Sequence, residues 1–93
     1  MKKKILITGS CGLIGSELVN FFLKKKYKVI GIDNNLRKYF FGKNASISWI
    51  KKKISKNTDY NHNNIDIRNF NAVKKIIKSN KDISAIIHCA AQP

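Results

Sequence analysis

The stretch TGSCGLIG at positions 8–15 decides the fold, because its three glycines separate two segments with different hydrophobic periods. Before it, Ile5, Leu6 and Ile7 form a short apolar run, which is typical of a strand buried on both faces. After it, apolar residues recur at helical spacing until lysines fill the expected last turn, near Lys26. The sequence therefore predicts a glycine-rich turn from a buried strand into a helix.

Each glycine of this stretch has a mechanical reason to be there. Gly9 lets the chain turn sharply off the strand, Gly12 lets backbone N–H groups approach a pyrophosphate, and Gly15 permits close packing of helix on strand. Asp33 closes the next apolar run, 29–32, where its carboxylate would accept hydrogen bonds from both hydroxyls of an adenosine ribose and repel a 2′-phosphate. The carboxylate at Asp33 favours NAD over NADP. The pattern as a whole favours a dinucleotide site over the alternative that the glycines serve only a tight turn.

The rest of the chain continues the alternation of strands and helices. We expect a third strand at 60–65, a helix capped by Asn69 that ends near Asn80, and a fourth strand at 83–88. The segment 34–59 is irregular and polar, with at most a weak helix at 48–55. The expected class is α/β, a Rossmann-like doubly wound parallel sheet of which about four strands with crossover helices are present.

Charge and composition narrow the function further. The 93 residues carry 19 Lys plus Arg against 5 Asp plus Glu, a net charge of +14. The lysines lie in separate clusters, which favours a solvated surface over the alternative of a nucleic-acid-binding basic domain. No apolar run approaches the roughly 20 residues that span a bilayer. We expect a cytoplasmic protein with no membrane or nucleic-acid partner, and its two cysteines lack the spacing of a metal site.

Two further motifs connect the chain to a known family. Asp66-Ile67-Arg68 follows the third predicted strand, and His88-Cys89-Ala90-Ala91-Gln92 follows the fourth. With TGSCGLIG and Asp33 they resemble extended short-chain dehydrogenases/reductases, and in particular the NAD-dependent epimerase/dehydratase family, whose members act on nucleotide-linked sugars. The loop after the second strand and the HCAAQP ending most resemble the CDP-paratose 2-epimerase (CDP-tyvelose epimerase) branch.

The resemblance implies a set of residues that bind NAD. It assigns the pyrophosphate to the glycine-rich loop and helix start, the adenosine ribose to the end of the second strand, adenine to the motif after the third strand and the nicotinamide side to the fourth. The residues are, in that order, Gly9, Gly12, Leu13, Ile14 and Gly15; Asp33, Asn34 and Arg37; Asp66 and Ile67; and Ala90, Ala91 and Gln92. Arg37 is the one residue of this set that could instead hold the 2′-phosphate of NADP.

The resemblance also indicates what the chain lacks. The family's Tyr-x-x-x-Lys pair lies well after the fourth strand, and Tyr39 to Lys43, which has that spacing, stands at the adenosine end of the cofactor. We therefore assign no catalytic residue here and expect the N-terminal part of a protein about three times as long. Alone it would be inactive and, with uncovered faces, marginally stable and prone to associate.

The whole protein is expected to be a homodimeric nucleotide-sugar epimerase. The alternatives are a 4,6-dehydratase or reductase of the same family and a non-catalytic NAD(P)-sensing regulator.

Two residues outside the cofactor set have plain interpretations. His88 should be packed or hydrogen-bonded at the end of a buried strand, and Cys11 should be inert for want of an adjacent basic partner.

Overall fold

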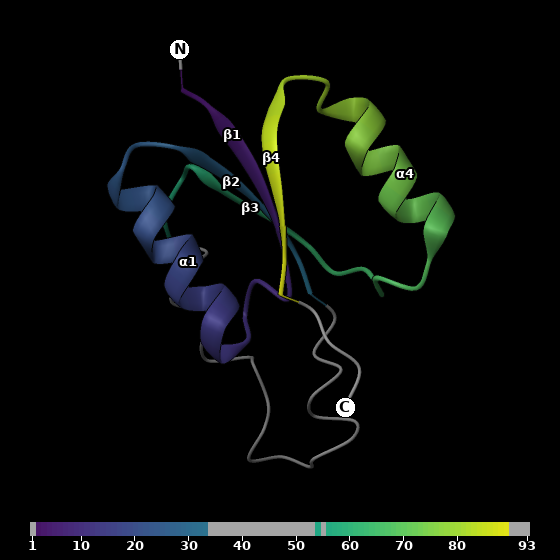
Figure 1. Cartoon of the computed structure of the whole chain (residues 1–93), viewed down its shortest axis with the longest axis horizontal. Coiled ribbons are helices and arrows are strands. Elements are labelled where there is room, and N and C mark those ends of the chain that lie inside the picture. Colours follow the sequence, from purple (N-terminus) through teal and green to yellow (C-terminus); the bar gives the residue numbers. More distant parts are fainter. Residues whose placement is uncertain (1, 34–53, 55, 90–93) are drawn as a thin grey trace.

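The computed structural model describes residues 2–33, 54 and 56–89, and within them it forms a four-stranded parallel sheet in the order β3-β2-β1-β4 (Figure 1). This confirms the predicted α/β class. The elements are β1 (Lys4–Thr8), α1 (Leu13–Lys24), β2 (Lys28–Ile32), β3 (Tyr60–Asn63), α4 (Phe70–Ser79) and β4 (Ile83–His88).

The sheet separates two apolar clusters, one beneath each helix. Ile5 and Ile7 of β1 pack with Val19 of α1, whereas Leu6 points to the opposite face and packs with Ile76 of α4. This alternation follows from the period of two along a strand. Figure 1 shows α1 and α4 on opposite sides of the sheet. β1 therefore contributes to both layers of the core, as its continuous apolar run predicted.

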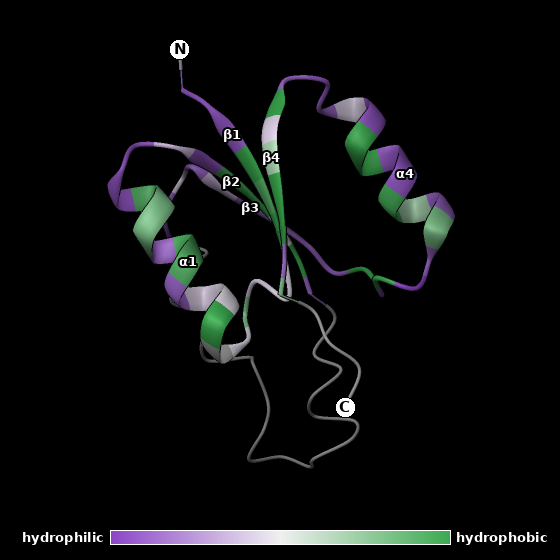
Figure 2. Cartoon of the chain, viewed as in Figure 1, coloured by the Kyte–Doolittle hydropathy of each residue, from purple (hydrophilic) through white to green (hydrophobic). Residues whose placement is uncertain are grey.

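The strands differ in polarity from the centre of the sheet to its edges. Figure 2 shows hydrophobic residues along β1, β2 and β4, whereas β3 is polar. β3 ends at Asn63, two residues earlier than expected, because the N–H of Ile65 turns back to the carbonyl oxygen of Asn63 at 3.0 Å. Ile65 then packs against the Leu6 cluster.

The fourth strand is less buried than its sequence predicted. β4 pairs with β1 on one side and is the outer strand of the sheet in the described part of the chain, and its Ile86 is 54% exposed. An apolar run therefore marks a strand but does not tell whether both of its faces are covered. In α4, by contrast, the predicted cap is confirmed, since Asn69 Oδ1 accepts from the N–H of Ala72 at 3.2 Å.

Some expectations lie outside the described residues. These are the polar segment from 34 to 53 and the weak helix at 48–55, of which only Ile54 is described, as a helical residue that is 3% exposed. Among the described helices, none is long and apolar enough to cross a membrane.

Leu6 is the residue at which this core should be most sensitive to truncation. It is 1% exposed, in the central strand, under α4. We expect Leu6→Ala to lower the free energy of unfolding of the full-length protein by about 2–5 kcal/mol, because it leaves a cavity that the sheet cannot close. Denaturant unfolding measures this. Leu6→Met, which nearly conserves volume, should cost less than about 1.5 kcal/mol, and equal losses in both variants would contradict the assignment.

Candidate cofactor-binding site

The loop between β1 and α1 folds back on itself at the carboxyl end of the sheet. Gly9 has a φ of 68°, a left-handed conformation that favours glycine. Its N–H donates to the carbonyl oxygen of Ile32 at 2.8 Å, and its own carbonyl oxygen accepts from the N–H of Gly12 at 3.0 Å. The loop is thus fastened to the end of β2 and closed by an internal hydrogen bond.

Gly15 lies against this loop in the first turn of α1. A Cβ on Gly15 would stand 1.9 Å from the carbonyl oxygen of Gly9 and 2.8 Å from its carbonyl carbon. The close approach predicted for Gly15 is therefore made to the glycine loop itself rather than to the strand. At Gly12 the limit is softer, since a Cβ there would lie 3.3 Å from the same oxygen.

The N-terminus of α1 is suited to an anion. Gly12 is its N-cap, and among the described residues no side chain caps the helix; its first turn holds no acidic residue. The first amides of a helix have no acceptor within the helix, and the helix dipole places positive partial charge there. Leu13 and Ile14 stand in this turn, as predicted. The contact of their N–H groups with a pyrophosphate stays a prediction.

Asp33 joins this loop to the next two strands. It follows β2 directly, and its Oδ2 accepts from the N–H of Cys11 at 3.1 Å. Its own N–H donates to the carbonyl oxygen of Asn63, at the end of β3, at 3.2 Å. The structure therefore brings the predicted ribose-binding carboxylate beside the predicted pyrophosphate loop, although they stand far apart in the sequence.

The motif after β3 is held in a defined shape. Both carboxylate oxygens of Asp66 accept from the guanidinium of Arg68, with Nη2 2.6 Å from Oδ2, and Oδ1 also accepts from the N–H of Arg68 at 2.9 Å. These hydrogen bonds lower the pKa of Asp66 to about 2, so the group is ionised at neutral pH. The side chain of Ile67 packs against the Leu6 cluster. The contact of both residues with adenine stays a prediction.

The end of β4 is fastened to the end of β1. The hydroxyl of Thr8 lies 2.7 Å from Nδ1 of His88 and also accepts from the N–H of Cys89 at 3.1 Å. His88 is thus hydrogen-bonded, as predicted, although it is exposed rather than buried. In the described ranges no group of His, Cys, Asp and Glu could hold a metal ion. Five predicted cofactor residues lie outside them: Asn34, Arg37, Ala90, Ala91 and Gln92.

A cluster of side chains that joins the loop to β3 was missed by sequence reasoning. Tyr60 OH lies 2.8 Å from Ser10 Oγ and 2.9 Å from His62 Nδ1, and the same nitrogen lies 4.0 Å from Cys11 Sγ. Cys11 therefore has a basic neighbour, contrary to the expectation from its sequence context. Burial raises the pKa of Tyr60 above its ordinary value, so the phenol keeps its proton. The signal available in the sequence was the alternation of Tyr60 and His62 on one face of β3.

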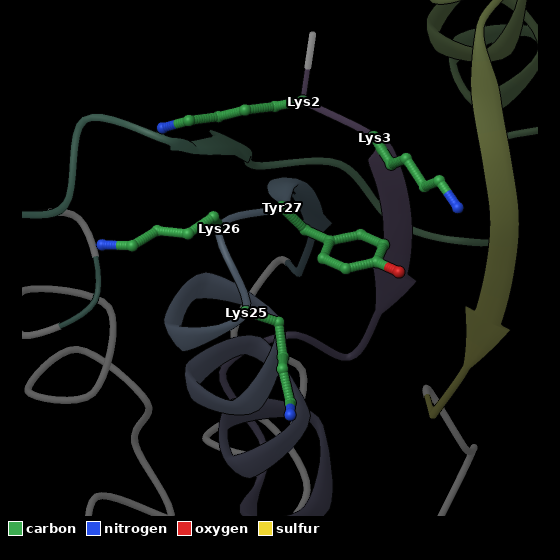
Figure 3. A pocket seen from close by; sticks show the side chains of 5 residues that line it. All are labelled: Lys2, Lys3, Lys25, Lys26 and Tyr27. Atoms are coloured by element: carbon green, nitrogen blue, oxygen red, sulfur yellow. The ribbon is translucent and has the colours of Figure 1, made fainter.

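A cavity of about 430 Å³ lies at the opposite end of the sheet and is not part of this site. Tyr27 and four lysines line it: Lys2, Lys3, Lys25 and Lys26. Figure 3 shows that their ammonium groups do not converge on one point: Lys2 and Lys26 extend to one side, Lys3 to the other, and Lys25 away from all three. This geometry favours a solvated surface, as the sequence analysis expected, and the absence of a nucleic-acid partner stays a prediction.

The glycine loop, the N-terminus of α1 and Asp33 together define a dinucleotide-binding α/β protein of the Rossmann type. Comparison with known families agrees. Residues 5–93 match the NAD dependent epimerase/dehydratase family, and the chain belongs to it. NAD is the cofactor of this family, and the described residues fit its pyrophosphate and ribose.

The relatives include several enzymes of nucleotide sugars. The chain is 35% identical over 88 residues to the UDP-glucuronate 4-epimerase of Thermodesulfobacterium geofontis, covering 94% of this chain and 26% of that protein. It is 38% identical over 74 residues to the CDP-paratose 2-epimerase of Salmonella typhi, covering 80% of this chain and 20% of that protein.

A solved structure agrees with the fold. The dTDP-glucose 4,6-dehydratase of Bacillus anthracis, in complex with NAD, superposes with a TM-score of 0.77 at 27% identity, covering 97% of this chain and 27% of that one. The chain thus spans about a quarter of the length of these proteins. Because relatives with different substrates match it, the comparisons support the family and do not single out the CDP-paratose branch.

Gly15 provides the sharpest test of the site's geometry. We expect Gly15→Ala to weaken NAD binding by the full-length protein about tenfold or more, because the added methyl group overlaps the Gly9 carbonyl and overpacking costs roughly 1–3 kcal/mol. Calorimetric titration with NAD measures it. Asn20→Ala, an exposed position on the same helix, is the control and should bind NAD like the wild type. Unchanged affinity in Gly15→Ala would show that the loop has been placed wrongly.

Proposed function

We propose that this chain is the NAD-binding portion of a nucleotide-sugar epimerase that works by transient oxidation of the sugar and return of the hydride. The observation that carries the proposal is the convergence of Gly9, the N-terminus of α1 and Asp33 at one end of the sheet. Family membership and relatives that are epimerases of nucleotide sugars support it. NAD would accept a hydride from a sugar carbon and give it back.

The described residues would bind and orient the cofactor rather than carry out the proton transfer. The helix start would neutralise the pyrophosphate, and Asp33 would fix the ribose while its Oδ2 holds the N–H of Cys11. Asn34 and Arg37 would extend the ribose site, and Ala90, Ala91 and Gln92 would lead toward the nicotinamide. We expect the catalytic Tyr-x-x-x-Lys pair in the remainder of the full-length protein. We also propose that this protein is a cytoplasmic homodimer.

The activity can be tested on the purified full-length protein with UDP-, CDP- and dTDP-linked sugars. We expect bound NAD in the denatured extract and, by NMR, conversion of one sugar into its epimer. A substrate deuterated at the oxidised carbon should keep its label, because the hydride returns instead of exchanging with water. Loss of water from the sugar would indicate a dehydratase, and net consumption of added NADH would indicate a reductase. Absence of both NAD and sugar chemistry would contradict the proposal.

Cofactor choice should depend on the charge of Asp33. We expect Asp33→Asn to raise the Kd for NAD about tenfold or more, because a charge-assisted hydrogen bond to the ribose contributes roughly 1.5–3 kcal/mol. The Kd for NADP should rise less or fall, since the repulsion of the 2′-phosphate is removed, and the amide oxygen can still accept from Cys11.

Titration with both dinucleotides measures the ratio of the two Kd values. Asp82→Asn is the matched control, because this carboxylate pairs with Lys4 at 3.2 Å on the surface. A ratio that moves equally in both variants would show that Asp33 does not contact the ribose.

A further inference from the structure

A hydrogen-bonded chain of side chains connects β3 to the glycine loop beneath the cofactor site. It runs from Ser10 through the hydroxyl of Tyr60 to His62, at 2.8 Å and 2.9 Å, and Cys11 Sγ lies 4.0 Å from the same histidine nitrogen. Ser10 and Cys11 are fully buried and Tyr60 is 8% exposed. Two consecutive residues of the loop are therefore contacted by two alternating residues of one strand.

Space for this chain exists because β2 carries a glycine where the chain crosses it. A Cβ at Gly31 would stand 2.1 Å from Tyr60 OH and 2.6 Å from Ser10 Oγ. Gly31 pairs with His62 on one side and with Ile7 on the other, so the side chains of Tyr60 and Ser10 meet directly over the backbone of β2.

The phenol hydroxyl is the middle of the chain, because it lies within hydrogen-bond distance of both Ser10 and His62. It carries one proton, so it can donate to only one of Ser10 and His62. Removal of the hydroxyl breaks both hydrogen bonds and leaves Ser10 Oγ buried without that partner. A buried hydroxyl that loses its partner costs more than the net value of one hydrogen bond.

The loop is the part of the structure that would respond. Ser10 stands between Gly9, whose N–H donates to Ile32, and Cys11, whose N–H donates to Asp33. A change in the position of Ser10 therefore acts on the backbone that is to meet the pyrophosphate.

We infer that Tyr60, oriented by His62, is a positioning residue that holds the glycine loop through Ser10 in the shape that binds the dinucleotide. The inference rests on the proposed function for the identity of the ligand. It assigns the positioning role to two residues of β3, and it predicts that the Tyr60 hydroxyl beneath the loop sets the affinity for NAD.

The test measures two quantities in the full-length protein. One is the exchange of the loop amides, residues 9–12, with deuterium in the absence of ligand, and the other is the Kd for NAD. For Tyr60→Phe we expect the exchange rate of the loop amides and the Kd for NAD each to rise about tenfold, because a buried hydrogen-bond partner is lost. Tyr27→Phe is the matched control. Tyr27 packs against the same apolar cluster but lines the cavity at the opposite end of the sheet (Figure 3), and neither quantity should change in it.

A double-mutant cycle separates positioning from general loss of structure. Ser10→Ala should raise the Kd for NAD, and the double variant Ser10→Ala/Tyr60→Phe should be no weaker than the worse of the two single variants, because both ends of one interaction are gone. Purely additive losses would overturn the inference. The inference would also be overturned if the loop amides of Tyr60→Phe and Ser10→Ala exchanged no faster than those of Tyr27→Phe. The same holds if Tyr60→Phe bound NAD with the Kd of the wild type.

Two complications leave the test decisive. If Tyr60→Phe fails to fold, Ser10→Ala is measured in its place, and wild-type loop exchange in Ser10→Ala overturns the inference. If the wild-type protein binds no NAD, the proposed function fails by itself, whereas faster loop exchange in Tyr60→Phe than in Tyr27→Phe still supports the role of Tyr60 in holding the loop.

Discussion

The approach of α1 to the carbonyl oxygen of Gly9 is the constraint on which the site depends. That oxygen accepts from the N–H of Gly12, and the missing side chain of Gly15 lets the helix come against it. The N-terminus of α1 consequently lies close to the carboxyl end of β1. A side chain at position 15 would hold the helix farther away. Asp33 reaches the loop because β2 is paired with β1 in a register that ends both strands together.

Local sequence patterns predicted the first half of this arrangement well. The apolar run before Thr8, the helical spacing after Gly12 and the second run up to Ile32 each depend on neighbouring residues, and the sheet and α1 confirm them. Asn69 could be assigned as a cap for the same reason, because its hydrogen bond spans one turn. The position of Asp33 beside the loop followed from the general rule that parallel strands end at the same edge.

Features that depend on distant residues could not be predicted in this way. The burial of β4 depends on what covers it, so its apolar sequence did not reveal that Ile86 is exposed. Cys11 has no basic neighbour along the chain, and His62 reaches it only through the pairing of β2 with β3. Similarly, nothing near Ser10 in the sequence indicates that its hydroxyl is bonded to Tyr60.

Gly31 has a consequence for how this sequence can change over evolutionary time. Its missing side chain is the room in which the hydroxyls of Ser10 and Tyr60 meet, so the three positions are not independent. A larger residue at position 31 would be tolerated only after a smaller side chain had replaced Tyr60. Ser10 would then have lost this hydrogen-bond partner. The three positions should therefore covary as one unit. In a relative that lacks the tyrosine, position 31 of β2 could carry a β-branched residue.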